Sequence, residues 1–424
     1  MAATAVPDGA LNQRERILYW ASAIAVLLLL GFLCFFPVQS DDLFMYLAIE
    51  VSTIATAYLV SLYRTRESLE AAFKYNLLVI MALLFALMGT IVVYSLMSDS
   101  VQGLGAIHVL EIGRSVAMLP PAIALSVVAF LVCAFGTESG MIPFHAWLPD
   151  AHSQAPTPIS ALLSGVVITI GAYCLARTVT LFTATFPSVV VLLATIASAS
   201  IVIGILMAIV QDDLKRLLAY SSISQISYIF EGLGLGTYLG VYGGLFHAVT
   251  HMLAKSLLFF CAGAIIYRTG IRRISELGGL ARKMPFTATC FFIGSVSMGG
   301  MPLLAGFMSK YSIILAVGKA GLWWAMGISA FAGLLTLACM VWAGWRVFWG
   351  PECEKVAALP STGREIPRSM MVPMAGAAGL IILLGLAPGL LFPSLDSATR
   401  SILGVMGPGQ PSVLEPDPLA ENTP

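Results

Sequence analysis

Long apolar runs separated by short polar loops make up most of the chain. A helix needs about 20 mostly apolar residues to cross the hydrocarbon core of a bilayer. Windows of that size occur about eleven times. The pattern therefore predicts an all-α, polytopic transmembrane bundle of about eleven helices. The windows fall at residues 17–37, 42–63, 75–97, 119–142, 157–182, 186–211, 217–235, 238–267, 286–317, 322–349 and 371–393.

Proline and glycine interrupt this pattern at two places. Pro143, Pro149, Pro156 and Pro158 lie in or beside the fourth and fifth windows, and residues 299–302, GGMP, split the ninth. Proline removes a backbone donor and clashes with the preceding helical turn. In lipid the freed backbone groups are tolerated only where protein or water satisfies them. A single break is as well explained by an ordinary proline kink, but two breaks near intramembrane charges favour ion paths.

Composition narrows the class of protein. Of 424 residues, 58% are hydrophobic and 10% are charged, which excludes a water-soluble protein and makes the lipid bilayer the main surroundings. The formal net charge is zero, so no nucleic-acid partner is predicted. The seven cysteines are scattered without a CxxC pair, and no metal site is predicted.

Basic residues gather in alternate loops of the predicted bundle. The loops between these contain Asp41, Asp42, Pro187 and residues 234–238, and carry almost no basic residue. By the positive-inside rule, we expect a multi-pass protein of the cell inner (plasma) membrane with a cytoplasmic N-terminus and an exterior C-terminus. The basic residues are Arg14, Arg16, Arg64, Arg66, Lys74, Lys215, Arg216, Arg268, Arg272, Arg273, Arg282, Lys283, Arg364 and Arg368.

Four charged residues lie inside the apolar runs: Glu50, Glu138, Lys255 and Lys310. An ionisable group at the bilayer centre costs at least about 2.5–3.5 kcal/mol on insertion scales, so each is a candidate for function. A buried group that exchanges a proton when a neighbouring charge moves is suited to a proton relay. A static ion pair between helices is the alternative for each residue.

Two histidines extend this set of candidates. His247, His251 and Lys255 are spaced by four residues, which places them on one face of a helix. Histidine titrates near physiological pH, so such a row can pass protons through intervening water. A histidine stripe packed against Ser and Thr side chains is the alternative. Metal binding is disfavoured because neither the HExxH glutamate nor a third ligand accompanies the pair.

Charged residues also gather near the first break. His145 and His152 flank Asp150, and we predict that the three line a water-filled channel entrance. The segment QDDLKR at residues 211–216 forms a compact cytoplasmic cluster, which by itself is typical of a solvated loop.

Three segments together resemble the core of the antiporter-like membrane subunits: FGTESGMIPFHAWLPDAHSQAPTPISALLSG, QDDLKRLLAYSSISQISYIFEGLGLG and HAVTHMLAKSLLFFCAGAII. This family includes the large membrane subunits of complex I, the Mrp sodium/proton antiporters, and the corresponding subunits of hydrogenase-4-type and formate-hydrogenlyase complexes. The resemblance covers about residues 20–350. The segment MYLAIEVSTIATAYLVSLYRTRESLEAAFKYNLL is more similar to the hydrogenase-4 component F branch.

The resemblance implies two inverted five-helix repeats, each with a broken helix and a half-channel, joined by a central row of charges. Family members commonly begin with about three further helices, so the first repeat is expected to be short at its N-terminus. The expected parts are a cytoplasmic segment at 1–16, the first repeat at 17–182, the second at 186–349, a cytoplasmic loop and final transmembrane helix at 350–393, and an exterior, disordered tail at 394–424.

The resemblance also assigns roles to single residues. Glu50 matches a family glutamate that pairs with a lysine on the first broken helix, and Lys255 and Lys310 match lysines of the central axis and the second half-channel. Glu138 stands where an FGTK-like motif usually has lysine, and Thr169 stands 31 residues later, where another lysine is common. Like charges then replace an attractive pair. Either the first half-channel works with a shared proton, or it does not pump.

The function implied is a proton-translocating subunit of a redox-driven complex, either NADH:quinone oxidoreductase-like or a membrane-bound hydrogenase or formate hydrogenlyase. No redox centre, cofactor or catalytic residue is expected in the chain itself. Expected partners are other membrane subunits, with iron-sulfur catalytic subunits contacted indirectly. The alternatives are a non-pumping structural or adaptor subunit and a subunit for sodium or inorganic-carbon transport. Glu138 and Thr169 favour these alternatives, whereas Glu50, Lys255 and Lys310 oppose them.

Overall fold

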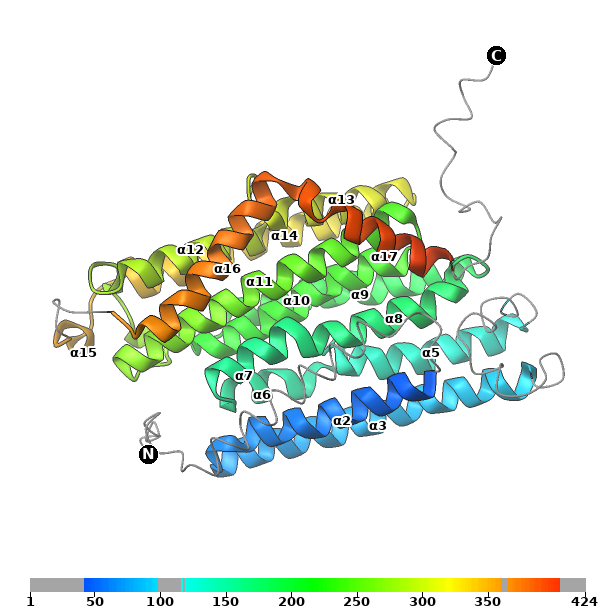
Figure 1. The fold of residues 1–424 in the computed structure, drawn as a ribbon, viewed down its shortest axis with the longest axis horizontal. Helices are drawn as coiled ribbons and strands as arrows, with labels where there is room; N and C mark the ends of the chain where they lie inside the picture. Colours follow the sequence, from blue (N-terminus) through cyan, green and yellow to red (C-terminus); the bar gives the residue numbers. More distant parts are fainter. Residues whose placement is uncertain (1–41, 98–115, 117–118, 360–364, 405–424) are drawn as a thin grey trace, which may run out of the picture.

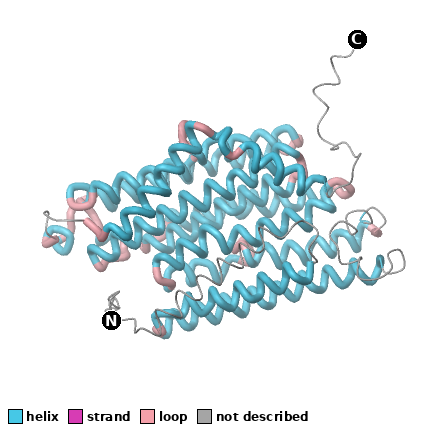
Figure 2. Tube along the Cα trace, in the orientation of Figure 1, coloured by secondary structure: helices cyan, strands magenta, loops and turns pink. Residues whose placement is uncertain are grey.

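The computed structural model describes residues 42–97, 116, 119–359 and 365–404. Every regular element in these ranges is a helix, apart from a single β-bridge between Asp213 and Arg273. The helices lie side by side along the long axis of the molecule (Figures 1 and 2). The first predicted window, 17–37, lies outside the described residues.

Two long helices form one edge of the bundle. α2 (Asp42–Val60) and α3 (Arg66–Met97) are joined by a tight turn, in which Arg64 has a φ of 52°. α5 (Pro121–Glu138) packs on α3, and α8 (Ile168–Thr183) packs on α5. Figure 1 shows this progression from the edge toward the centre.

The centre of the bundle is formed by α9 (Pro187–Ile209), α10 (Leu214–Gly234) and α11 (Tyr238–Thr269). Every residue of α10 except Arg216 is buried. α10 is rich in serine and glycine, and small residues let neighbouring helices approach closely within a membrane. This helix therefore presents its polar side chains to other helices and not to lipid.

The second half of the chain supplies the outer helices α12 (Pro285–Gly299), α13 (Ala305–Lys319), α14 (Trp323–Trp349) and α16 (Arg368–Leu386). Large apolar side chains on α14 and α16 face outward. Such a surface suits contact with lipid, whose acyl chains carry no hydrogen-bonding groups. The most exposed of these side chains on α14 and α16 include Trp323, Phe331, Leu334 and Val372.

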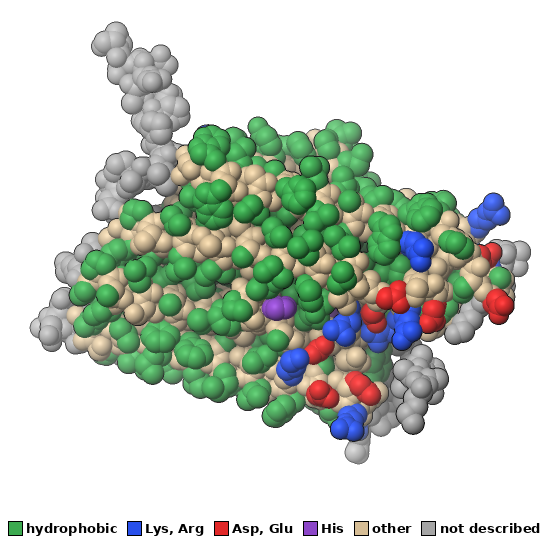
Figure 3. Space-filling view, turned by 180° about the vertical axis from the view of Figure 1, so that it is seen from behind, with side chains coloured by type: hydrophobic (Ala, Val, Ile, Leu, Met, Phe, Trp, Pro, Cys, Tyr) green, Lys and Arg blue, Asp and Glu red, His purple; other side chains and the backbone are tan. Residues whose placement is uncertain are grey.

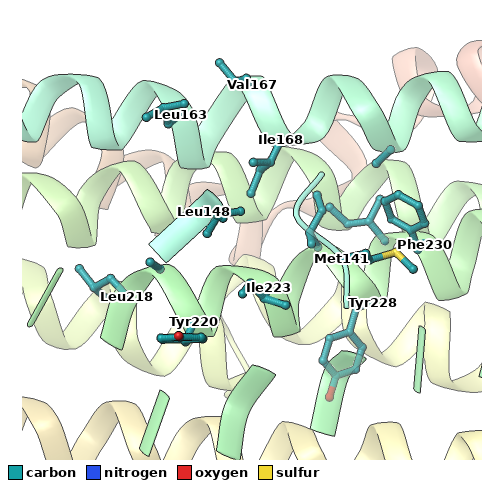
Figure 4. Close-up of a cluster of buried hydrophobic side chains, with 14 of the residues drawn as sticks. Met141, Leu148, Leu163, Val167, Ile168, Leu218, Tyr220, Ile223, Tyr228 and Phe230 are labelled. Atoms are coloured by element: carbon teal, nitrogen blue, oxygen red, sulfur yellow. The ribbon is translucent and has the colours of Figure 1, made fainter. Parts of the chain in front are cut away.

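The first predicted break lies between α5 and α8. α5 ends at Glu138, and Trp147 Nε1 donates to the Thr137 carbonyl oxygen at 2.7 Å, which satisfies a backbone acceptor at the end of the helix. Figure 4 shows Met141 and Leu148 of the connecting segment among buried apolar side chains of α10 and of the helix leading into α8. The segment contains η4 (His145–Trp147), α6 (Leu148–Gln154), α7 (Thr157–Leu162) and the π-helical turn η5 (Leu163–Val167).

The second predicted break separates α12 from α13. α12 ends at Gly299, and Gly300 follows with a φ of +81°, a conformation that glycine adopts without the steric cost of a Cβ atom. Leu303, with a φ of 72°, lies in the same connection. Both interruptions of the apolar pattern are therefore real breaks in helices.

Seven described helical segments are long and apolar enough to cross a membrane. α10 is not among them because it is more polar, and neither are α12 and α13, since each has only 15 residues. The all-helical membrane fold is confirmed. The number of eleven spans and the division into two inverted repeats stay predictions.

Charged side chains gather at one end of the molecule, whereas the rest of the visible face is mostly hydrophobic (Figure 3). Lys74 contacts Asp150, Arg272 contacts Asp213, and Lys283 contacts Glu352, with N–O distances of 2.7, 2.8 and 2.7 Å. We call this the charged end. Its composition agrees with the predicted sorting of basic loops to one side, and the side of the membrane that it faces stays a prediction.

The segment after α16 differs from the disordered tail expected from residue 394. Helix α17 (Phe392–Gly404) packs against α11, and Figure 1 shows it beside that helix. Tyr238 Oη donates to Asp396 Oδ1 at 2.6 Å, and Arg400 binds the same carboxylate at 3.0 Å. The expectation is therefore wrong for the start of the tail, because an amphipathic helix has a surface on which to pack.

Candidate functional site

Lys255 lies at the middle of the bundle, on α11, and is completely buried. Its Nζ atom donates to the Leu218 carbonyl oxygen at 2.9 Å and to Ser221 Oγ at 2.5 Å, both on α10. In the described part of the chain no carboxylate lies within 4.0 Å of this Nζ atom. The lysine is therefore held by neutral acceptors. These favour the protonated ammonium form less strongly than a carboxylate in an ion pair would.

Lys310 lies on α13, one to two turns beyond the second break, and is also buried. Nζ donates to the Met298 carbonyl oxygen at 2.7 Å. That carbonyl belongs to the last turn of α12, where the break leaves carbonyl groups without helical partners. The Lys310 Nζ atom also lies 4.6 Å from the ring centroid of Tyr228, a cation–π distance. The broken helix thus creates the binding position of this lysine.

His247 and His251 connect the surroundings of the two lysines. Both are buried on α11, and their ring centroids are 6.4 Å apart. His247 Nδ1 lies 2.9 Å from Ser309 Oγ on α13, whereas His247 Nε2 and both ring nitrogens of His251 have no hydrogen-bond partner among the described residues. Buried polar atoms of this kind hydrogen-bond to water when a path is hydrated. The structure brings these four residues together as one group, and their role as a relay stays a prediction.

Glu138 and Glu50 lie near one another at the first break. Glu138 is buried at the end of α5, and its Oε2 atom has no hydrogen-bond partner among the described residues. Glu50 is half-buried on α2, close enough for the two charges to interact. The buried ring of Tyr75 lies within range of both charges. The role of these two carboxylates in proton transfer stays a prediction.

Thr169 supplies no charge to this region. Its hydroxyl donates to the Val166 carbonyl oxygen at 2.6 Å, on its own helix. The preceding turn, η5, is π-helical, a distortion that is frequent at functional sites and that shifts the register of following side chains.

The predicted entrance residues lie at different depths. Asp150 is partly exposed at the charged end and pairs with Lys74 at 2.7 Å and with Arg216 at 3.8 Å. His145 is partly buried, and its ring centroid is 6.4 Å from that of Tyr220. His152 is completely buried and stacks on Phe259, with centroids 5.1 Å apart. His152 is therefore an interior group, and only the other two lie near a surface.

The segment at 211–216 is not simply a solvated loop. Asp213 caps α10 by accepting from the backbone N–H groups of Lys215 and Arg216, and the same carboxylate pairs with Arg272. Lys215 is only 5% exposed. Its Nζ atom donates to the Ala155 carbonyl oxygen at 2.6 Å, in the first break. This lysine belongs to the interior beside His152, which the sequence alone did not indicate.

Glu231 is a buried carboxylate that the sequence reasoning missed. It lies on α10 and accepts from Ser198 Oγ at 3.1 Å and from Ser329 Oγ at 2.6 Å. The sequence contains a signal for this residue, because Glu231 interrupts the apolar run YIFEGL in the way that Glu50 interrupts its own run. The same criterion of an intramembrane charge selects it.

The family comparison decides the class of protein. The model of the family described as "NADH:quinone oxidoreductase/Mrp antiporter, TM" matches residues 40–336. The chain belongs to this family. The resemblance stated from the sequence motifs is thereby confirmed, and the chain is an integral membrane protein with an antiporter-like fold.

Individual relatives of this antiporter-like subunit agree with that assignment. NADH-quinone oxidoreductase subunit N of Desulforudis audaxviator is 34% identical over 370 residues, which cover 82% of this chain and 70% of that protein. The hydrogenase-4 component F homolog of Methylacidiphilum infernorum is also 34% identical, over 273 residues that cover 64% of this chain and 57% of that protein. Because the identities are equal, the similarity to the component F branch stays a prediction.

A solved structure supports the arrangement of helices. A chain of the membrane-bound sulfane sulfur reductase, an archaeal respiratory membrane complex, superposes with a TM-score of 0.77 at 28% identity. The match covers 86% of this antiporter-like subunit and 72% of that chain. Similar chains are thus found as parts of multisubunit membrane complexes.

Proposed function

We propose that this antiporter-like subunit translocates protons within a redox-driven membrane complex. The observation that carries the proposal is that Lys255 and Lys310 are buried against neutral oxygen atoms, with the partly unpartnered imidazoles of His247 and His251 between them. A lysine in such surroundings releases its proton more easily than a lysine paired with a carboxylate. The names of the relatives, an NADH-quinone oxidoreductase subunit and a hydrogenase-4 component, support the redox-driven setting.

The proton path that we propose begins at the charged end. Asp150, between Lys74 and Arg216, binds protons from water at that surface. Inward of it, Lys215 and His152 lead toward Lys255. Water in the path carries the proton between groups that are not in direct contact. The proposal takes the charged end as the cytoplasmic side of the plasma membrane.

From Lys255 the proposed path follows α11. His251 and His247 lie one and two turns away on the same helical face, and His247 reaches Ser309 on α13 beside Lys310. A positive charge on one lysine disfavours a positive charge on the other. Arrival of a proton at Lys255 therefore promotes release of a proton from Lys310. Movement of charge in a neighbouring membrane subunit is the proposed trigger.

The pair of Glu50 and Glu138 has a separate proposed role. Two carboxylates whose charges repel each other favour a state in which one of them is protonated. The first half-channel then transfers a proton through a carboxylate pair in place of the usual lysine. The alternative, a first half that does not pump, is favoured by Thr169, whose hydroxyl is bound to its own helix.

A non-pumping adaptor is the second candidate function for the whole chain. The observation in its favour is the loss of positive charge at both Glu138 and Thr169. A subunit for sodium or inorganic-carbon transport is a related possibility. The retained lysines of the second half oppose both, because a scaffold has no need of two buried lysines that form no ion pair within the described part of the chain.

The test is proton uptake by inverted membrane vesicles that contain the intact complex. Lys255→Ala and Lys310→Ala are each expected to abolish coupled uptake, because each variant removes a charge from the relay, while the complex still assembles. Lys319→Ala is a matched control, since Lys319 is exposed at the end of the helix that carries Lys310. Uptake at the wild-type rate in both relay variants would disprove the proposal in favour of the adaptor.

A further inference from the structure

Glu231 lies far from the charged end of the molecule. α10 begins beside Asp213, which pairs with Arg272 at the charged end, and ends at Gly234. Glu231 is therefore in the last turn of α10, roughly 5 Å along the axis from its end at 1.5 Å per residue. The proposed path through Lys255 and Lys310 leaves this buried carboxylate unused.

The carboxylate of Glu231 joins three helices. Ser198 of α9 donates to Oε1, and Ser329 of α14 donates to Oε2, at 3.1 and 2.6 Å. Both oxygens therefore receive a hydrogen bond from a hydroxyl, and no basic side chain lies within 4.0 Å of either in the described part of the structure. Hydroxyl groups both donate and accept, so they serve a carboxylate and a carboxylic acid equally well.

Tyr228 connects this site with Lys310. Tyr228 lies three residues before Glu231, on the same side of α10. Its hydroxyl donates to the Ser329 carbonyl oxygen at 2.6 Å, and the Ser329 hydroxyl donates to Glu231. On the other side, Lys310 Nζ is 4.6 Å from the Tyr228 ring, and the His247 ring centroid is 5.9 Å from it. A single tyrosine thus separates the carboxylate from the group around Lys310.

We infer that Glu231 is a further proton-carrying residue, which exchanges protons between Lys310 and the end of the molecule opposite the charged end. The inference rests on the proposed function. In the step, the Lys310 ammonium loses a proton and the Glu231 carboxylate gains it, which leaves a neutral amine and a carboxylic acid. The acid then releases the proton to water at the far end of α10, and the carboxylate is restored.

The competing explanation is that Glu231 only ties α9, α10 and α14 together. Glu231→Gln separates the two explanations, because the amide has nearly the same shape and still accepts a hydrogen bond but binds no proton in the physiological range. Glu276→Gln is a matched control, since Glu276 ends the short helix η6 (Ile274–Glu276), far from the buried groups, with a side chain that is 45% exposed and pairs with Arg273.

The experiment compares inverted vesicles that contain the intact complex with wild-type chain, Glu231→Gln, Glu231→Asp or Glu276→Gln. We expect Glu231→Gln to slow proton uptake by roughly 10²-fold, the lower end of what a positioned proton-transfer group contributes. Glu231→Asp, which keeps a titratable carboxyl group, is expected to retain most of the uptake, and Glu276→Gln all of it. Wild-type uptake in Glu231→Gln overturns the inference.

Infrared difference spectroscopy detects changes in the protonation of a carboxyl group during turnover. A residue with a purely structural role shows no such change. During turnover of the wild-type complex we expect a carboxylic-acid carbonyl band that is absent in Glu231→Gln. If Glu231→Gln does not assemble, loss or shift of this band in Glu231→Asp supports the inference, and an unchanged band overturns it. If the wild-type complex itself takes up no protons, the proposed function is refuted. If the wild type pumps and Glu231→Gln pumps equally well, only the inference about Glu231 is refuted.

Discussion

At the scale of single residues, the choice of partner decides what a buried charge does. Lys255 and Lys310 bind carbonyl and hydroxyl oxygens, whereas Lys74 and Lys283 at the charged end bind carboxylates. A lysine paired with a carboxylate keeps its proton. A lysine bound to neutral acceptors releases its proton at a lower free-energy cost. Glu138 forms no ion pair with a described residue, and the charge that acts on it is the like charge of Glu50.

Glu138→Gln tests whether the first half-channel is active. If the two carboxylates share a proton, the amide removes the proton-binding group, and proton uptake by vesicles with the intact complex should fall at least about tenfold. Glu276→Gln serves as the control for a Glu-to-Gln change at the surface. Undiminished uptake in Glu138→Gln, together with loss in Lys310→Ala, means that only the second half conducts.

At the scale of elements, the breaks in helices create polar positions that continuous helices lack. The end of α12 exposes the Met298 carbonyl oxygen that binds Lys310, and the connection between α6 and α7 exposes the Ala155 carbonyl oxygen that binds Lys215. Each break thus places an acceptor opposite a buried lysine. The left-handed Gly300 is what allows the chain to turn at the second break.

Gly300→Ala is expected to destabilise the second break by about 1–2 kcal/mol, because a residue with a Cβ atom is strained in the left-handed conformation. The new methyl group also meets Lys310 Cδ at 3.3 Å, so proton uptake should fall as well. Thermal unfolding of the purified complex measures the first effect. Gly327→Ala on α14 is the control, since a Cβ atom there meets nothing within 4 Å and should not lower stability. Equal melting of the two variants would refute a strained turn.

At the scale of the whole molecule, the two ends of the bundle differ in chemistry. Salt bridges gather at the charged end, whereas the opposite end is covered in part by α17, which returns to α11 at Tyr238. The hydrogen bond from Tyr238 and the charge of Arg400 hold the pKa of Asp396 below its ordinary value. Since Asp396 and Tyr238 are 158 residues apart, this contact joins distant parts of the chain.

The Asp396 contact should make the attachment of α17 dependent on pH. The lowered pKa means that Asp396 binds a proton less tightly when α17 is attached than when it is detached. The contact therefore stabilises the attachment fully at neutral pH, and this stabilisation is lost as the pH falls through the lowered pKa. Hydrogen–deuterium exchange in residues 392–404 is expected to be faster in Asp396→Asn than in wild type at neutral pH. Asp212→Asn, at the opposite end, is the control. Equal exchange in wild type and Asp396→Asn would show that apolar packing alone holds α17.

Local pattern was sufficient for the helices and both breaks, because a bilayer requires about 20 apolar residues for each span and tolerates irregular backbone only where protein or water covers it. Some described helices follow the predicted windows closely, as in α9 (Pro187–Ile209) for 186–211 and α14 (Trp323–Trp349) for 322–349, whereas α3 (Arg66–Met97) begins well before its window of 75–97. The intramembrane charges Glu138, Lys255 and Lys310 were equally visible, since a charge in an apolar run is conspicuous in any sequence.

The membrane class, the apolar helices and most of the buried charges could be predicted from local sequence, because these depend on each segment's own exchange between water and lipid. Which groups meet became clear from the packing of the helices. It buried Lys215 against Ala155, moved His152 to the interior, and placed Glu231 between Ser198 and Ser329. Hydrogen bonds across helices depend on which faces pack together, and the periodicity within one helix does not specify its neighbours.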